Sequence, residues 1–147
     1  MDNSLKVYDL TNEDSLTSNL LLDSNTLESG SSLDPWKVCF NPKNSGQIIT
    51  GQQNLQVADI SKDLKIQSEI KHHKYINCMD YAPSGSLMAT GDIDGAVRIF
   101  DSTSKEQKGQ VFSNHGRGVR CLKFAPDSSS IISGGEDLHI YLCDVET

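Results

Sequence analysis

A set of landmarks that recurs about every 40–45 residues constrains this chain more than any other feature. Prolines that follow a short apolar run occur at Pro42, Pro83 and Pro126, which lie 41 and 43 residues apart. Residues that close the later runs recur in the same phase, at Gly51, Gly91, Gly134, Asp59, Asp101 and Asp144. A period of this length predicts a chain built from repeated structural units rather than one continuous sheet or helical bundle.

Each repeat unit reads as a group of short strands. In the clearest copy, residues 71–101, the runs Ile76–Tyr81 and Leu87–Thr90 and a third run are joined by turns rich in Gly, Pro and Asp. The plan recurs at 115–144, and a looser copy lies at 35–59. Alternating runs separated by such turns predict an antiparallel meander, so the expected fold class is all-β.

The two clear copies share polar residues in register: His72 with His115, Thr90 with Ser133, Asp94 with Asp137, and Asp101 with Asp144. These positions resemble the WD-repeat β-propeller family. The resemblance implies a buried hydrogen-bond chain of histidine, strand hydroxyl and turn aspartate within each blade. Phe100 and Cys143 stand where the family has tryptophan. Neither supplies an indole N–H, so each chain is expected to have three members.

The repeats predict one partial β-propeller of about three four-stranded antiparallel blades that form an open arc. Residues 1–27 are expected to end one blade, 28–70 to form a degenerate repeat, 71–113 a full repeat, and 114–147 a repeat without its last strand. Apart from the runs given above, strands are expected at Leu5–Asp9, Leu16–Leu22, Trp36–Phe40, Gln47–Gly51, Leu55–Asp59, Leu64–Ile70 and Gln107–Phe112.

The repeat at 28–70 lacks the polar landmarks. Ser31 takes the histidine position, and no aspartate lies in its second turn. We therefore expect packing and ladder hydrogen bonds alone to hold this blade together.

Composition excludes several classes of function. The net charge of −7 argues against a phosphate-binding or nucleic-acid surface, which needs clustered Lys and Arg. No apolar run approaches 18 residues, so no membrane span is expected. Four cysteines without CxxC-type spacing, Cys39, Cys78, Cys121 and Cys143, are expected to be small buried core residues, with no disulfide and no zinc site. The chain is expected in the nucleus and cytoplasm.

Two chemical readings of the polar residues are open but weak. His115, Ser133 and Asp137 have the residue types of a catalytic triad, yet the set occurs twice at a fixed period, which favours a structural role. The histidines lack a carboxylate or thiol partner that would complete a metal site. We therefore expect no catalysis, no metal and no cofactor.

The remaining function is assigned to surface residues. In propellers the loops between strands four and one, and between strands two and three, share one face. By register this face is expected to carry Asp34, Trp36, Tyr75, Asn77, Ile93, Arg117, Arg120 and Glu136. Aromatic and arginine side chains are enriched at binding hot spots, so we expect a protein partner there. Core packing is the competing reading for Trp36, the only tryptophan.

The order of the degenerate and full repeats looks like the middle blades of the superkiller WD-repeat subunit family. The residues that carry this likeness are Asp34–Pro42, Thr50–Gly51, Met88–Gly95 and Ile99–Asp101. The resemblance implies a non-enzymatic adaptor in the messenger-RNA-decay helicase complex, with tetratricopeptide-type partners, and in the transcription-elongation complex of RNA polymerase II. A substrate receptor of a ubiquitin ligase, a histone-tail reader and an enzyme are the alternatives.

The ends of the arc carry a further expectation. Each terminal blade lacks one packing neighbour, and repeat arrays need caps to cover such faces. We therefore expect self-association or completion by missing blades.

Overall fold

Short strands make up nearly all of the computed structural model, which describes residues 5–8, 20–23 and 37–146. Within these residues the chain is all-β apart from one 3₁₀ turn, η1 (Ile60–Lys62). The strands form one two-stranded, two four-stranded and one three-stranded sheet, all antiparallel. The predicted fold class is confirmed.

The sheets follow the order of the chain. The N-terminal pair is β1 (Lys6–Tyr8) and β2 (Leu20–Asp23). The first blade is β3 (Val38–Asn41), β4 (Asn44–Thr50), β5 (Asn54–Asp59) and β6 (Lys65–Lys71). The second blade is β7 (Ile76–Tyr81), β8 (Leu87–Asp92), β9 (Val97–Asp101) and β10 (Gln107–Phe112). The third blade is β11 (Val119–Phe124), β12 (Ser130–Gly135) and β13 (Ile140–Asp144).

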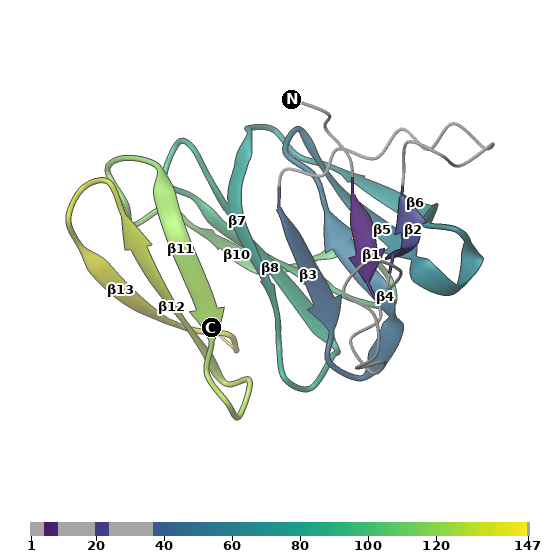
Figure 1. Cartoon of the computed structure of the whole chain (residues 1–147). Coiled ribbons are helices and arrows are strands. Elements are labelled where there is room, and N and C mark those ends of the chain that lie inside the picture. The colour runs from purple at the N-terminus through teal and green to yellow at the C-terminus, as the bar shows by residue number, and fades with distance from the viewer. Residues whose placement is uncertain (1–4, 9–19, 24–36, 147) are drawn as a thin grey trace.

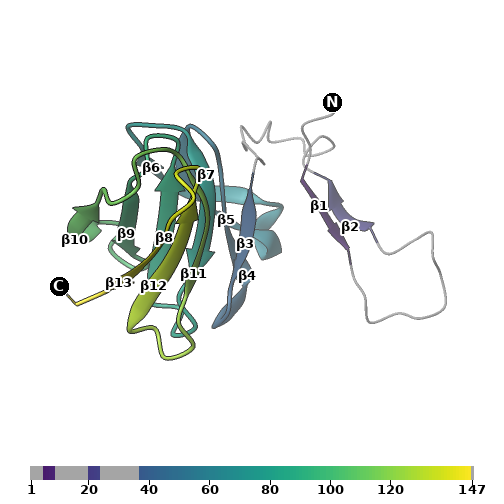
Figure 2. The same ribbon diagram turned by 90° about the vertical axis from the view of Figure 1, so that its left-hand side faces the viewer.

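The blades stand face to face in a row. In Figure 1 the third blade lies at the left, the second in the middle and the first at the right. The opening strands β3, β7 and β11 lie next to one another, so they form the inner side of the arc. Figure 2 shows the N-terminal pair beside β3 and β4, at the opposite end from β12 and β13. The row is open, as expected for a partial propeller.

Apolar cores fill the spaces between neighbouring blades. One core contains Ile49, Leu55 and Val57 of the first blade against Met88 and Phe100 of the second. The other contains mainly residues of the second and third blades, among them Ala89, Val97, Ile99, Leu122 and Ile131. A sheet between two cores is buried on both faces, which is why all six residues of β8 are buried.

One predicted core residue lies outside the core. The four cysteines are free thiols in strands, but Cys121 is exposed while Cys78 and Cys143 are buried. Cys121 precedes the core residue Leu122 on β11, so its side chain lies on the face of the strand that points away from the second blade. The prediction that all four are buried is therefore wrong for this residue.

The first blade holds more than ladder bonds. The side chain of Gln47 accepts from Asn41 Nδ2 at 2.9 Å and from Tyr81 Oη at 3.2 Å. It donates to Gln67 at 3.3 Å, and Gln67 donates to Asp59 at 2.8 Å. This amide network joins all four strands of the first blade, so the expectation that packing and ladder bonds act alone is wrong.

Candidate protein-binding surface

A buried polar chain closes the third blade at the end that carries the candidate surface. His115 Nδ1 lies 2.9 Å from Asp137 Oδ1, and His115 Nε2 lies 3.0 Å from Ser133 Oγ. The backbone N–H of Gly116 donates to Asp137 Oδ2 at 3.0 Å. A carboxylate only accepts, so Nδ1 donates to Asp137. The chain ties the loop before β11 to β12 and to the β12–β13 turn.

The charge on Asp137 suits this role. Desolvation alone would raise the pKa of Asp137, but hydrogen bonds from His115 and from the N–H groups of His139 and Gly116 outweigh it. They lower the pKa to about 2. The carboxyl group is therefore ionised at neutral pH and holds three donors.

The same three residues have the spacing of a catalytic triad, so access decides between the two readings. Ser133 is only 2% exposed and His115 only 5% exposed. A substrate carbonyl cannot reach the Ser133 hydroxyl in this arrangement. The geometry therefore serves the blade rather than acyl transfer.

The second blade differs from the expected chain. His72 Nε2 lies 3.0 Å from Thr90 Oγ1, but His72 Nδ1 lies 2.7 Å from the carbonyl oxygen of Lys74. Asp94 instead pairs with the Lys74 ammonium at 2.7 Å, and both side chains are 52% exposed. Asp94 thus lies outside the His72–Thr90 pair, and the predicted third member of this chain is wrong. Burial lowers the pKa of His72, which keeps its ring neutral.

The cause lies two residues before the turn aspartate, where Asp92 occupies the position that Gly135 takes in the third blade. A Cβ at Gly135 would lie 2.4 Å from His115 Nδ1 and 2.8 Å from Asp137 Oδ1. The third-blade chain therefore requires a glycine at this position. A residue with a side chain, as at Asp92, is incompatible with the same arrangement.

Asp92 takes over the turn of the second blade, a role that the sequence analysis missed. It is fully buried, and its Oδ1 accepts from the backbone N–H groups of Asp94 at 3.0 Å and Ala96 at 2.9 Å. Arg98 Nε lies 3.9 Å from its other oxygen. An aspartate that binds backbone N–H groups ahead of it is an ordinary turn device, so the Asp92–Gly95 run could have revealed it.

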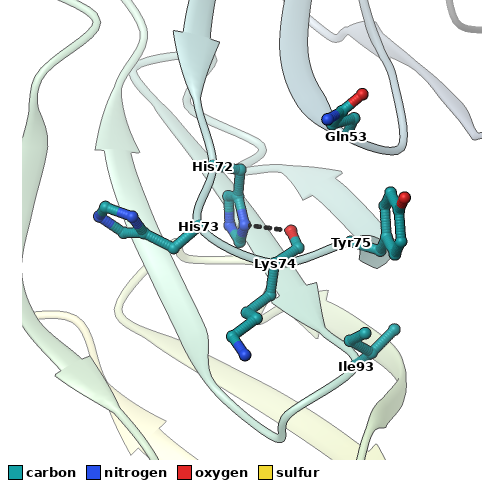
Figure 3. Close-up of a pocket in the computed structure, with 6 residues that line it drawn as sticks. All are labelled: Gln53, His72, His73, Lys74, Tyr75 and Ile93. Carbon is teal, nitrogen blue, oxygen red and sulfur yellow. Dashed lines mark hydrogen bonds between the residues drawn. The ribbon is translucent and has the colours of Figure 1, made fainter.

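Two predicted surface residues meet beside a shallow pocket. Tyr75 is 50% exposed and Ile93 is 41% exposed, and the Ile93 N–H donates to the Tyr75 carbonyl at 3.0 Å. The pocket has a volume of about 280 Å³ and is lined by Gln53, His72, His73, Lys74, Tyr75 and Ile93. Figure 3 shows Tyr75 and Ile93 on one side of the loop, with His73 pointing the other way.

The arginines lie on the next blade. Arg120 pairs with Glu136 at 2.5 Å, and the Glu136 N–H donates to the Gly118 carbonyl at 2.9 Å. Arg117 is exposed. Its loop approaches the β8–β9 turn closely, because a Cβ at Gly95 would lie 2.6 Å from the Arg117 carbonyl oxygen. This approach brings the Ile93 turn and the Arg117 loop together.

The other predicted surface residues are placed as follows. Asn77 is half-buried, and a Cβ on Gly118 would lie 3.3 Å from its amide nitrogen. Asp34 and Trp36 lie outside the described residues. The structure thus brings together Tyr75, Ile93, Asn77 and the Arg117 loop, with the Arg120–Glu136 pair beside them on the third blade.

A second buried aspartate, Asp80, joins all three blades and was also missed. Its Oδ1 accepts from Lys123 Nζ at 2.6 Å, and its Oδ2 accepts from the Phe124 N–H at 3.1 Å. Cys39 Sγ lies 3.6 Å from Oδ1. Cys39, Asp80 and Lys123 hold the same register position on β3, β7 and β11, so only their periodic spacing could have revealed the contact.

Metal and membrane chemistry find no support in the part of the chain that the structure describes. No group of three or more His, Cys, Asp and Glu side chains among residues 5–8, 20–23 and 37–146 could hold a metal ion. In the same residues there is no helix with the length and apolar character needed to cross a bilayer.

Comparison with known proteins identifies the repeats. The family model described as WD domain, G-beta repeat, matches residues 64–101 and 106–144, together more than half of the chain. Both matched segments run from the outermost strand of one blade through the third strand of the next. No curated protein matches the chain.

Proposed function

The chain belongs to the WD40 family of G-beta repeats, and from this premise we propose that it is a protein-binding scaffold with no catalytic activity of its own. WD40 repeats are in general interaction modules. The polar residues that most resemble an active site, Ser133 and His115, are buried and bonded within their blade. Because Ser133 and His115 are buried, contacts with other molecules are made by exposed side chains.

The proposed binding surface is the cluster formed by Tyr75, Ile93, Asn77, Arg117 and the adjoining pocket. The observation that carries this assignment is the half-exposed state of Tyr75 and Ile93 at a pocket edge. Large apolar side chains with this exposure gain free energy when a partner covers them. Arg120 and Glu136 extend the surface as a polar rim.

The finer proposal concerns the assembly. The likeness of the repeat order to the superkiller WD-repeat subunits supports an adaptor role in a messenger-RNA-decay helicase complex, in a transcription-elongation complex, or in both. Such an adaptor would work in the nucleus and cytoplasm. The net charge of −7 agrees with contacts to protein subunits rather than directly to nucleic acid.

Affinity capture with point variants tests this function. Tagged wild-type chain is expected to retain a superkiller-type helicase and its tetratricopeptide partner, identified by mass spectrometry. Tyr75→Ala and Ile93→Ala should reduce that recovery at least about tenfold, which is the loss of a hot-spot contact of roughly 1.4 kcal/mol or more. Tyr8→Ala is the matched control, because Tyr8 is 55% exposed on β1, away from the proposed surface.

The outcomes separate the possible partners. The wild-type chain could instead recover ubiquitin-ligase subunits or histone tails, and the Tyr75→Ala and Ile93→Ala variants could lose them. That result would support the proposed binding surface but assign the chain to a different complex. Equal recovery with Tyr8→Ala, Tyr75→Ala and Ile93→Ala would show that this surface is not the one that binds.

A further inference from the structure

Arg98 is an almost buried cation in the second blade. Its side chain is 17% exposed and belongs to β9, where Arg98 pairs across the ladder with Thr90 of β8. The Nε atom of Arg98 lies 3.9 Å from Oδ2 of Asp92. Within the described residues, neither of these two atoms has a hydrogen-bond partner. Charged side chains are rarely buried without a partner, so the attraction between these two groups keeps both charges inside the blade.

The matched positions of the three blades show that Asp92 and Arg98 belong together. Each blade has a hydroxyl residue at the same place on its second strand, at Thr50, Thr90 and Ser133. The residue two places later and the residue paired with the hydroxyl residue across the ladder are Gln52 and Gln56 in the first blade, Asp92 and Arg98 in the second, and Gly135 and Tyr141 in the third. In these three blades, charged residues therefore occupy both positions or neither.

Asp92 fixes the turn that carries Ile93. Its Oδ1 atom accepts from the N–H groups of Asp94 at 3.0 Å and Ala96 at 2.9 Å. The N–H group of Ile93 donates to the Tyr75 carbonyl at 3.0 Å, so the same turn also sets where Ile93 lies relative to Tyr75 (Figure 3). The two exposed side chains of the proposed binding surface thus depend on one buried carboxylate.

The charge of Asp92 depends in turn on Arg98. Asp92 is 0% exposed, and opposite charges attract more strongly in the interior than at a wet surface. Without the cation, the carboxylate would regain solvation only by moving toward water, and this movement would break its hydrogen bonds to the turn. Lys74 and Asp94 form an ion pair beside the same turn, but both are 52% exposed, so water replaces either partner.

We propose that Arg98 is a positioning residue for the binding surface. Its charge, acting through the buried Asp92, holds the turn that presents Ile93 beside Tyr75. Arg98 itself makes no contact with the partner. This role rests on the proposed function of the surface, whereas the effect of Arg98 on the turn does not.

Hydrogen exchange read by NMR tests the effect on the turn in the whole chain. Arg98→Met removes the charge and should speed amide exchange of Asp94 and Ala96 at least about tenfold, because their acceptor is no longer held in place. Lys74→Met is the matched control, since it removes an exposed cation beside the same turn. Its exchange rates should stay within about twofold of wild type. Equal rates in wild type and Arg98→Met, or equal acceleration in both variants, would overturn the proposal.

A double variant separates charge from packing. In Asp92→Asn/Arg98→Met the amide oxygen can accept the same two N–H groups without a charge, so exchange should return to within about threefold of wild type. Exchange as fast as in Arg98→Met alone would show that Arg98 acts by packing, and would overturn the role of its charge. If Arg98→Met alone is insoluble, a soluble double variant supports the proposal, and two insoluble variants overturn it.

The capture experiment gives the functional readout. Recovery of the helicase by Arg98→Met should fall at least about tenfold, as for Ile93→Ala, and the double variant should restore it. Recovery lost in Ile93→Ala but kept in Arg98→Met would overturn the positioning role. Recovery kept in both, with faster exchange in Arg98→Met, would refute the proposed surface and still confirm that Arg98 holds the turn.

Discussion

At the scale of single residues, one side chain decides how each blade closes its turn. Gly135 leaves room for the His115 ring to reach Asp137, whereas Asp92 occupies the same position in the second blade and binds the turn itself. The two repeats are therefore alike in sequence landmarks and different in hydrogen bonding. Substitutions at matched positions should consequently have unequal effects.

The first prediction compares the two blades. Ser133→Ala should cost about 1–3 kcal/mol of unfolding free energy, because it leaves Nε2 of the buried His115 without a partner. Asp94→Ala should leave the urea midpoint unchanged, because its partner Lys74 is exposed and regains water. Urea denaturation of both variants measures the difference. A urea midpoint for Asp94→Ala as low as that for Ser133→Ala would contradict the assignment of Asp94 to the surface.

The second prediction concerns pH. Burial lowers the pKa of His72 in the folded chain below its ordinary value of 6.5, so the unfolded chain takes up this proton first as the pH falls. Proton uptake by the unfolded state removes stability. The melting temperature should therefore fall from about pH 7 to pH 5, and the fall should be shallower in His72→Gln. Parallel profiles for the two proteins would rule out this contribution.

At the scale of elements, the inner strands β3, β7 and β11 are joined by one buried carboxylate. Asp80 receives Lys123 and the Phe124 N–H from the third blade, and Cys39 approaches it from the first. The contact couples blades that otherwise meet mainly through apolar side chains.

The third prediction is a double-mutant cycle across this contact. Asp80→Ala and Lys123→Ala should each destabilise the chain, and the double variant should lose less than the sum. The expected coupling energy is about 0.5–3 kcal/mol, as for residues in direct contact. The matched exposed pair Arg120 and Glu136 serves as the control and should show a smaller coupling. A Lys123–Asp80 coupling of zero would mean that the ion pair does not join the blades.

The strands themselves could be predicted well from the sequence. The bounds predicted for β7 and β10 coincide with those of the structure, because alternation and turn residues are local signals. Asp80 could not be assigned, since its partners lie 41 and 44 residues away on other sheets. The choice between Asp92 and Asp94 depended on the space beside a histidine ring. The binding role of Tyr75 and Ile93 stays a prediction.

At the scale of the whole molecule, the blades differ in how many of their sheet faces pack against a neighbouring blade. The second blade is packed on both faces, whereas the third is packed on one. All residues of β8 are buried, but β12 alternates between buried Ile131 and exposed Ile132. Local stability should follow this difference.

The fourth prediction is that the third blade has the lowest local stability. Amide hydrogens of β12 and β13 should exchange at least about tenfold faster than those of β8 and β9 in dilute protein, because fewer apolar contacts oppose local opening. Hydrogen exchange read by mass spectrometry measures this. Equal protection in dilute monomer would show that the row unfolds as one unit.

Each blade also carries a different chemical group at the register position shared by Cys39, Asp80 and Lys123. Neutral thiol, carboxylate and ammonium occupy equivalent places on adjacent strands, and the carboxylate stands between the other two. A tandem duplication of the second blade would set two aspartates side by side in a buried space, where like charges repel. The units therefore cannot be multiplied or reordered freely. The side chains that meet between neighbouring blades therefore fix the order of the blades along the chain.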